Sequence, residues 1–291
     1  INNILHGETK YYDRKQNLVS RPDILDRNGV VLATSLPTTS LYADPLKIIN
    51  AEEVARRLTE VLPDLRSISL LKKLKKPGRF VWLARNLSPQ FQFEINRLGL
   101  PGISFRRSEK RVYPHGNLAA HILGLTNVDG EGVAGVEKYF NHNLRTGSGS
   151  IHLSIDSRIQ SILQTELGRA IQNFKAIGGA GVVMDVESGE IIAMASLPDY
   201  NPNYPNTMTV ESGFNRAAKG VYEMGSTFKL FTVATALDLG IINFTDGYDA
   251  SKPIQIARFS INDYHAKKRW LSVPEIILYS SNIGAAKMAQ D

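Results

Sequence analysis

Two β-prone runs joined by a short turn constrain the fold of this chain more than any other feature. Residues 182–185 and 190–195 are rich in β-branched and apolar side chains, and residues 187–189, Glu-Ser-Gly, form a turn signal between them. Together they predict an antiparallel hairpin. Ahead of it, apolar residues recur at helical spacing from 159 to 171, after a possible N-cap at Asp156. A hairpin packed beside helices predicts an α+β layer structure.

The length of the chain indicates two domains. Its 291 residues exceed the usual size of a single domain and can bury a large core. A hydrophobic fraction of 43% and a charged fraction of 21% are typical of a folded protein. Residues 145–150, Arg-Thr-Gly-Ser-Gly-Ser, are a short flexible stretch. We therefore predict a first domain over residues 1–147 and a second over residues 148–291.

Several segments of the first domain have clear local patterns. Asn28 and Gly29 lie between two apolar runs and predict a hairpin, because both residues tolerate positive φ. An apolar stripe over residues 51–62 and a segment capped by Ser88 predict two helices. Short strands are expected at residues 40–43 and 80–84.

The charged residues of the first domain do not define a site. The basic run over residues 72–79 is interleaved with leucines, so we interpret it as the solvated face of an amphipathic helix. Arg111, His115, His121 and Glu137 have no metal-ligand or catalytic spacing, and we interpret them as packing and salt-bridge residues. The net charge of +6 would suit a polyanion, but charge alone does not choose among nucleic acid, anionic lipid and an acidic envelope polymer.

Composition also excludes some chemistry. The sequence contains no cysteine, which rules out disulfides, thiolate catalysis and cysteine-ligated metals. No apolar run approaches the roughly 20 residues needed to span a bilayer. The first residue is Ile1 instead of methionine, so we expect the chain to be a portion of a longer protein.

A serine and a lysine three residues apart form the candidate site. Ser226 and Lys229 open an apolar segment that ends at Gly240. If a helix begins at Ser226, the two side chains stack on one face, and the lysine can act as the base for a serine nucleophile. The helix N-terminus would also favour developing negative charge. The apolar positions that predict a buried helix are Phe228, Phe231, Val233, Ala234 and Leu237.

A polar triplet downstream makes this motif more specific. Ser280, Ser281 and Asn282 interrupt two apolar helical segments. Ser-x-x-Lys followed by Ser-x-Asn matches two of the three motifs of serine β-lactamases and penicillin-binding proteins. His265 is an alternative base for Ser226, but it has no visible orienting partner and Lys229 fits the role locally.

On these motifs the chain resembles class B penicillin-binding proteins, most closely the septal type of peptidoglycan D,D-transpeptidase. The resemblance covers nearly the whole chain, with landmarks in the family's order. It implies an elongated, non-catalytic pedestal domain followed by part of a transpeptidase domain, in which helices flank an antiparallel sheet. These landmarks are residues 21–33, 111–116, 132–137, 182–195 and 215–217.

The resemblance also implies the roles of the site residues. Ser226 would attack the penultimate D-alanine carbonyl of a peptidoglycan stem peptide, giving an acyl-enzyme that an amine of a neighbouring strand resolves. Lys229 would be the base, Ser280 a proton relay, and Asn282 a ligand of the substrate amide that also holds Lys229. The backbone N–H of Ser226 would be half of the oxyanion hole. β-Lactams would acylate the same serine, and neither a cofactor nor a metal is expected.

The family's third motif, Lys-Thr-Gly or Lys-Ser-Gly, does not occur in this sequence. We therefore expect the chain by itself to be a catalytically incomplete enzyme. The resemblance further implies a membrane anchor in the full-length protein, a location in the bacterial inner membrane with the catalytic part in the periplasm, and no nucleic acid partner. Expected partners are divisome membrane proteins, including a glycan polymerase.

Three alternatives stay open. The first is a transpeptidase of side-wall elongation, which sequence separates only weakly from the septal type. The second is a structural module of the division complex, whose first domain docks a glycan polymerase or scaffold protein. The third is a β-lactamase or β-lactam sensor, which shares the motifs but has no need of the long first domain.

Overall fold

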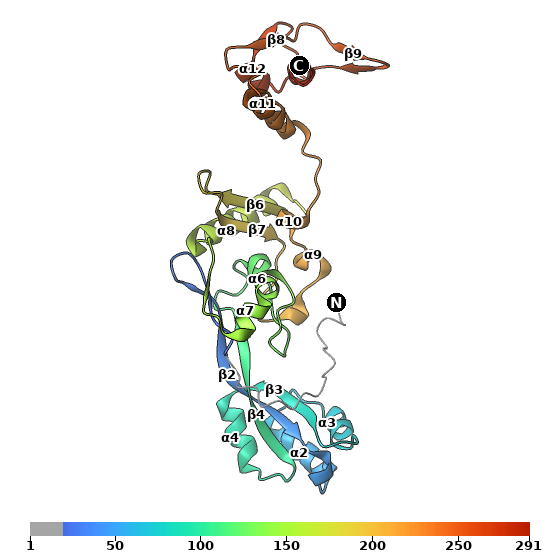
Figure 1. Cartoon of the computed structure of the whole chain (residues 1–291). Helices are drawn as coiled ribbons and strands as arrows, with labels where there is room; N and C mark the ends of the chain where they lie inside the picture. The colour runs from blue at the N-terminus through green and yellow to red at the C-terminus, as the bar shows by residue number, and fades with distance from the viewer. Residues whose placement is uncertain (1–19) are drawn as a thin grey trace. The chain divides into compact units, whose positions relative to one another are not determined.

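The computed structural model describes residues 20–291 (Figure 1). It divides into two compact units, one ending at Gly220 and the other comprising Val221–Asp291. Both units mix helices with antiparallel strand pairs, as the sequence predicts. The domain boundary expected between residues 147 and 148 stays a prediction. Within the described residues, no helix is long and apolar enough to cross a lipid bilayer.

A long central strand organises the first part of unit 1. The strand β2 (Val31–Ala43) pairs antiparallel with β1 (Ile24–Leu25), β3 (Val81–Leu87) and β4 (Ile103–Val112), and β5 (Ile151–His152) joins β1 in parallel. The hairpin predicted at Asn28 and Gly29 is confirmed as the β1–β2 connection, with φ of 83° at Gly29. The separate short strand expected at residues 40–43 is wrong, because it is the end of β2.

Pro37 explains why the sequence pattern breaks this strand in two. A proline cannot donate a backbone hydrogen bond, so it is rare inside central strands. In β2, however, Pro37 falls between the residues that pair with β1 and those that pair with β3, where only β4 is a partner. One side of the strand therefore has no ladder bond to lose at this position.

Three helices cover one face of the β2–β3–β4 part of the sheet (Figure 1). They are α2 (Ala51–Val61), α3 (Ser67–Leu74) and α4 (Pro89–Arg97), and they confirm the predicted helices. Ser88 accepts a hydrogen bond from the N–H of Phe91, as its predicted capping role requires. The helices bury a core against the sheet that includes Leu41, Leu58, Leu70, Leu83 and Ile95.

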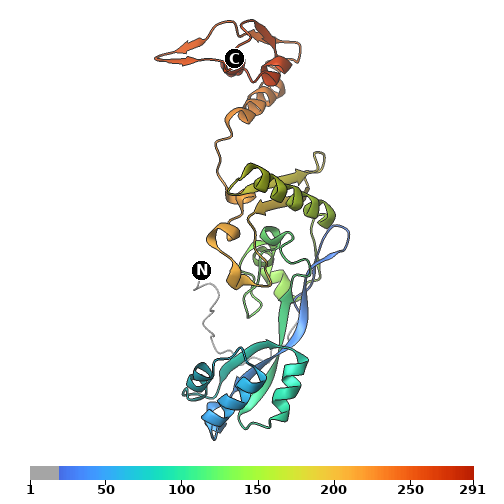
Figure 2. The same ribbon diagram turned by 180° about the vertical axis from the view of Figure 1, so that it is seen from behind.

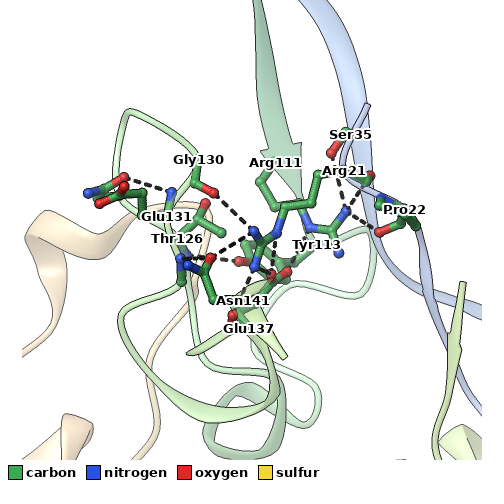
Figure 3. Close-up of polar contacts among 12 residues, drawn as sticks. Arg21, Pro22, Ser35, Arg111, Tyr113, Thr126, Gly130, Glu131, Glu137 and Asn141 are labelled. Carbon is green, nitrogen blue, oxygen red and sulfur yellow. Dashed lines mark hydrogen bonds and ion pairs between the residues drawn. The ribbon is translucent and has the colours of Figure 1, made fainter. Parts of the chain in front are cut away.

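A buried ion network ties the segment before β1 to the end of β4 and to α6 (Gly135–Tyr139), as Figure 3 shows. The Glu137 side chain is fully buried, and its two carboxylate oxygens accept from Arg111 Nε at 2.6 Å and Arg21 Nε at 2.7 Å. The salt-bridge interpretation of Arg111 and Glu137 is confirmed. His115 is exposed, so the packing interpretation is wrong for that residue.

The hairpin that opened the sequence argument is present in the second part of unit 1. The strands β6 (Gly179–Met184) and β7 (Ile191–Leu197) pair antiparallel, and α8 (Ser157–Phe174) lies across them (Figure 2). Asp156 caps α8, as predicted, by accepting from Arg158 N–H. A Cβ at Gly181 would come within 2.9 Å of Leu163, so this glycine permits the close approach of helix and sheet.

Short helices complete unit 1, and each connects the longer elements without adding to the sheets. They are η1 (Pro45–Lys47), α5 (Ala120–Leu123), α7 (Asn141–Thr146), η2 (Pro205–Thr207), α9 (Val210–Gly213) and α10 (Arg216–Lys219).

Unit 2 is built from helices and short strand pairs. Its helices pack around a small core, and two strand pairs, β8–β11 and β9–β10, are both antiparallel. The elements in chain order are η3 (Gly225–Phe228), α11 (Lys229–Asp238), β8 (Gly247–Asp249), β9 (Ile254–Ile256), β10 (Phe259–Ile261), β11 (Trp270–Ser272), α12 (Val273–Leu278) and α13 (Asn282–Met288).

The prediction of a buried helix after Ser226 is only half right. Val233 and Ala236 of α11 are buried, but Phe228 and Phe231 are 62% and 66% exposed. Within unit 2, α11 packs against η3, α12 and α13. The apolar pattern indicates a helix with much apolar surface, but it does not say how much of that surface the unit itself covers.

Candidate active site

Ser226 lies in a short 3₁₀ turn that leads into α11. The turn begins at Gly225, whose φ of 56° is in the left-handed region that glycine adopts freely. The Oγ1 of Thr227 donates to Met224 O at 2.9 Å and helps to hold the turn. The α-helix proper starts at Lys229, one turn later than a helix beginning at Ser226. Ser226 itself is exposed, so its hydroxyl is accessible.

Lys229 connects the two predicted motifs. Its Nζ donates to Ser226 Oγ at 3.2 Å, to Ser280 Oγ at 2.9 Å and to Ser280 O at 2.8 Å. These three acceptors match the three donors of an ammonium group. Burial lowers the pKa of Lys229, and the negative charge of Asp263 opposes this effect by raising it. A lowered pKa makes the neutral form, which a base requires, more accessible.

Ser280 reaches the lysine because of an unusual backbone conformation. It follows α12 with φ of 53°, a left-handed value that is uncommon for a residue other than glycine. Its N–H donates to Ile277 O at 3.1 Å, which closes the end of α12. The next residue, Ser281, caps α13 by accepting from Gly284 N–H at 2.9 Å. The turn between the two helices thus presents both the carbonyl and the hydroxyl of Ser280 to Lys229.

Asn282 belongs to the same turn as Ser280, but its side chain binds Asn262 instead of Lys229. Its Nδ2 donates to Asn262 O at 2.7 Å, and within the described residues it makes no hydrogen bond with Lys229. The Asn262 carbonyl accepts from one N–H of the Asn282 amide, so the amide oxygen and the second N–H are left for another partner. Its role as a ligand of the substrate amide stays a prediction.

Ser226, Lys229 and Ser280 border a hollow of about 270 Å³, which Thr227, Leu230 and Ile277 also line. A hydroxyl, an amine and a second hydroxyl in hydrogen-bond contact can act as nucleophile, base and proton relay, the set that serine acyl transfer requires. His265 is exposed and its ring lies edge-on to Tyr264, at 4.7 Å between centroids. Among residues 20–291, no group of three or more His, Asp or Glu side chains could hold a metal ion.

Sequence reasoning missed the contribution of Asn262 and Asp263. Asp263 accepts from Ser281 Oγ at 2.8 Å and from Ile283 N–H at 2.9 Å, and Asn262 O binds Asn282. These residues lie in the segment between β10 and β11, far from the triplet along the chain. No local pattern marks them, since the contacts exist only in the folded unit.

Comparison with family models identifies the class of protein. Residues 16–173 match the penicillin-binding protein dimerisation domain, and residues 179–291 match the penicillin-binding protein transpeptidase domain. This chain therefore belongs to the penicillin-binding protein family, in the class B type with a dimerisation domain ahead of the transpeptidase domain.

Individual relatives agree with this class. The chain is 40% identical over 275 residues to the probable peptidoglycan D,D-transpeptidase FtsI of Caulobacter vibrioides, covering 93% of this chain and 46% of that protein. It is 33% identical over 317 residues to the peptidoglycan D,D-transpeptidase FtsI of Escherichia coli K12, covering 98% and 54%. The chain thus spans about half the length of these relatives.

Solved structures share the fold. A peptidoglycan synthetase from Bifidobacterium adolescentis is 24% identical, with a TM-score of 0.66, over 94% of this chain and 59% of that chain. Penicillin Binding Protein 2X from Streptococcus thermophilus is 22% identical, with a TM-score of 0.62, over 94% and 49%. The predicted α+β class is confirmed.

Proposed function

We propose that this chain is part of a peptidoglycan D,D-transpeptidase that cross-links stem peptides during septal cell-wall synthesis. The observation that carries the proposal is the position of Lys229 Nζ between Ser226 Oγ and Ser280 Oγ, in a chain of the transpeptidase family. The names of the FtsI relatives support the septal role over side-wall elongation.

The geometry suits formation of an acyl-enzyme. Neutral Lys229 takes the proton of Ser226 as Oγ attacks the carbonyl carbon of the penultimate D-alanine. The tetrahedral intermediate collapses when the C–N bond to the terminal D-alanine breaks, and that amine leaves with a proton delivered through Lys229 and Ser280. The backbone N–H of Ser226 donates to no backbone carbonyl in the described structure, and it would donate to the oxyanion.

The second half of the reaction reuses the same groups. An amine from a neighbouring strand attacks the acyl carbonyl, loses its proton to Lys229 or Ser280, and releases Ser226 as a hydroxyl. A β-lactam enters the same path at the first step, because its strained amide mimics the terminal dipeptide. Ring opening then leaves the drug attached to Ser226.

The location and partners belong to the same proposal. A periplasmic catalytic part anchored in the inner membrane would place Ser226 next to peptidoglycan stem peptides. Divisome membrane proteins, including a glycan polymerase, would supply new strands for cross-linking.

Labelling with a fluorescent penicillin tests the proposed reaction in the natural gene product. We expect the wild type to become covalently labelled, and the Ser226→Ala variant to lose the label completely because it has no nucleophile. Ser251→Ala, a serine of unit 2 outside the hollow, should label like the wild type. Retained labelling of the Ser226→Ala variant would exclude this serine as the nucleophile.

A further inference from the structure

The segment between β10 and β11 is hydrogen-bonded to the turn formed by Ser280, Ser281 and Asn282. Both carboxylate oxygens of Asp263 are used, one by the hydroxyl of Ser281 and the other by the N–H of Ile283. The carbonyl of the preceding residue, Asn262, accepts from the side chain of Asn282 at 2.7 Å. Two consecutive residues thus bind three consecutive residues at the junction of α12 and α13.

This arrangement exceeds what capping of α13 requires. Ser281 already supplies the local cap by accepting from Gly284 N–H. Asp263 accepts from a second N–H at this helix end, that of Ile283. It also accepts from the hydroxyl of the capping residue, Ser281. Ser281 is 1% exposed, so this hydroxyl would lack an acceptor without the carboxylate.

These contacts fix the conformation of Ser280, the residue directly before the capping Ser281. The left-handed backbone of Ser280, with φ of 53°, persists only where the surrounding structure enforces it. The same conformation directs the Ser280 carbonyl and hydroxyl to Lys229 Nζ, at 2.8 and 2.9 Å. A change in the turn would therefore move two of the three acceptors of the proposed base.

We propose that Asp263, with the carbonyl of Asn262, is a positioning element that fixes the Ser280–Asn282 turn for acylation of Ser226. This inference rests on the proposed function, because the rate of acylation is the property that Asp263 would set. Asp263 touches neither Ser226 nor Lys229 by hydrogen bond, and it acts through the turn.

The charge of Asp263 gives a second, separable effect. Asp263 raises the pKa of Lys229 against the lowering caused by burial. Other charged groups of α12, α13 and the β10–β11 segment have partners of their own. Glu275 pairs with Arg269 at 2.7 Å, Lys287 donates to Asp249 O at 2.7 Å, and Lys267 lies over the Tyr279 ring at 4.6 Å. Removing the carboxylate charge should therefore lower the pKa of Lys229, and acylation should begin to rise at lower pH.

The test compares three variants of the natural gene product: Asp263→Ala, Asp263→Asn and Asp249→Asn. Asp249 is a matched control, since it accepts a backbone N–H in the same unit but has no contact with the triplet. The readouts are the second-order rate constant of penicillin acylation per active site, the fraction of molecules that can be acylated, and the pH profile of the rate.

We expect Asp263→Ala to lower the rate constant per active site by about 10- to 100-fold, the effect typical of a misplaced catalytic group. Asp263→Asn should lose less, because its amide can still accept from Ile283 N–H and donate to Ser281 Oγ. In both variants the rising limb of the pH profile should move to lower pH. Asp249→Asn should match the wild type in all three readouts.

A wild-type rate constant and an unshifted pH profile in Asp263→Ala would overturn the inference. So would a loss confined to the fraction of acylatable molecules, since that outcome indicates folding alone. If Asp263→Ala does not fold, Asp263→Asn decides the question, and a wild-type rate constant per active site in that variant would overturn the proposal. Absence of labelling in the wild type is a different failure, because it would reject the proposed function itself.

Discussion

Replacing Lys229 by methionine is expected to slow penicillin acylation by about 10²- to 10⁴-fold, the range usual for loss of a general base. Lys229 Nζ is the only group hydrogen-bonded to Ser226 Oγ in the described part of the chain. Methionine keeps the apolar stem of the side chain but cannot accept the proton. Stopped-flow measurement of acylation in the natural gene product gives the rate directly.

The pH dependence separates loss of the base from a general disturbance. In the wild type the rate should rise with pH as Lys229 loses its proton, at a pH below the ordinary lysine pKa because burial lowers it. This limb should be absent in Lys229→Met. Lys287→Met, which removes a lysine of α13 bonded to Asp249 O, should keep both the rate and the limb. A wild-type rate in Lys229→Met would refute its role as base.

Glu137→Ala is expected to destabilise unit 1 by about 3–5 kcal/mol, the cost typical of breaking a buried ion pair from one side. The carboxylate of Glu137 is fully buried, and it is the counter-ion of both Arg21 and Arg111. Removing it leaves two buried guanidinium groups whose charge water cannot reach. Denaturant unfolding of the natural gene product, monitored by hydrogen exchange at residues 103–112, measures the loss of unfolding free energy in the strand that carries Arg111.

A surface ion pair provides the control for this effect. Glu131 pairs with Arg145, and their side chains are 52% and 45% exposed. Because exposed pairs contribute at most about 1 kcal/mol, Glu131→Ala should have little effect. Equal destabilisation by the two substitutions would contradict the assignment of Glu137 as the centre of the network.

Local patterns in the sequence were sufficient for most elements. The hairpins at Asn28-Gly29 and at residues 185–190, and the helices capped by Ser88 and Asp156, depend on neighbouring residues and are present as predicted. The short strand expected at residues 40–43 belongs to the longer β2, in which Pro37 lies where only β4 is a partner.

The candidate site was predictable only in part, because some of its contacts join residues that are distant along the chain. The Ser226–Lys229 contact follows from a spacing of three residues, so it could be expected from the sequence. The motif implied that Ser280 approaches Lys229. This approach depends on the left-handed backbone of Ser280 between two helices, and no local pattern predicts that conformation. The contacts of Asp263 are purely tertiary and were not foreseen. Likewise, Arg111 and Glu137 were recognised as salt-bridge residues, whereas Arg21 was not.

The most direct test of the central claim is to locate the covalent adduct. The natural gene product is incubated with a penicillin and digested with trypsin, which should release residues 220–229 after cleavage at Lys219 and Lys229. Fragment masses distinguish Ser226 from Thr227 within this peptide. We predict that the peptide carries the mass of one intact penicillin on Ser226, because ring opening expels no part of the drug. An adduct on Thr227 or on the peptide containing Ser280, or no adduct at all, would contradict the assignment of Ser226 as the nucleophile.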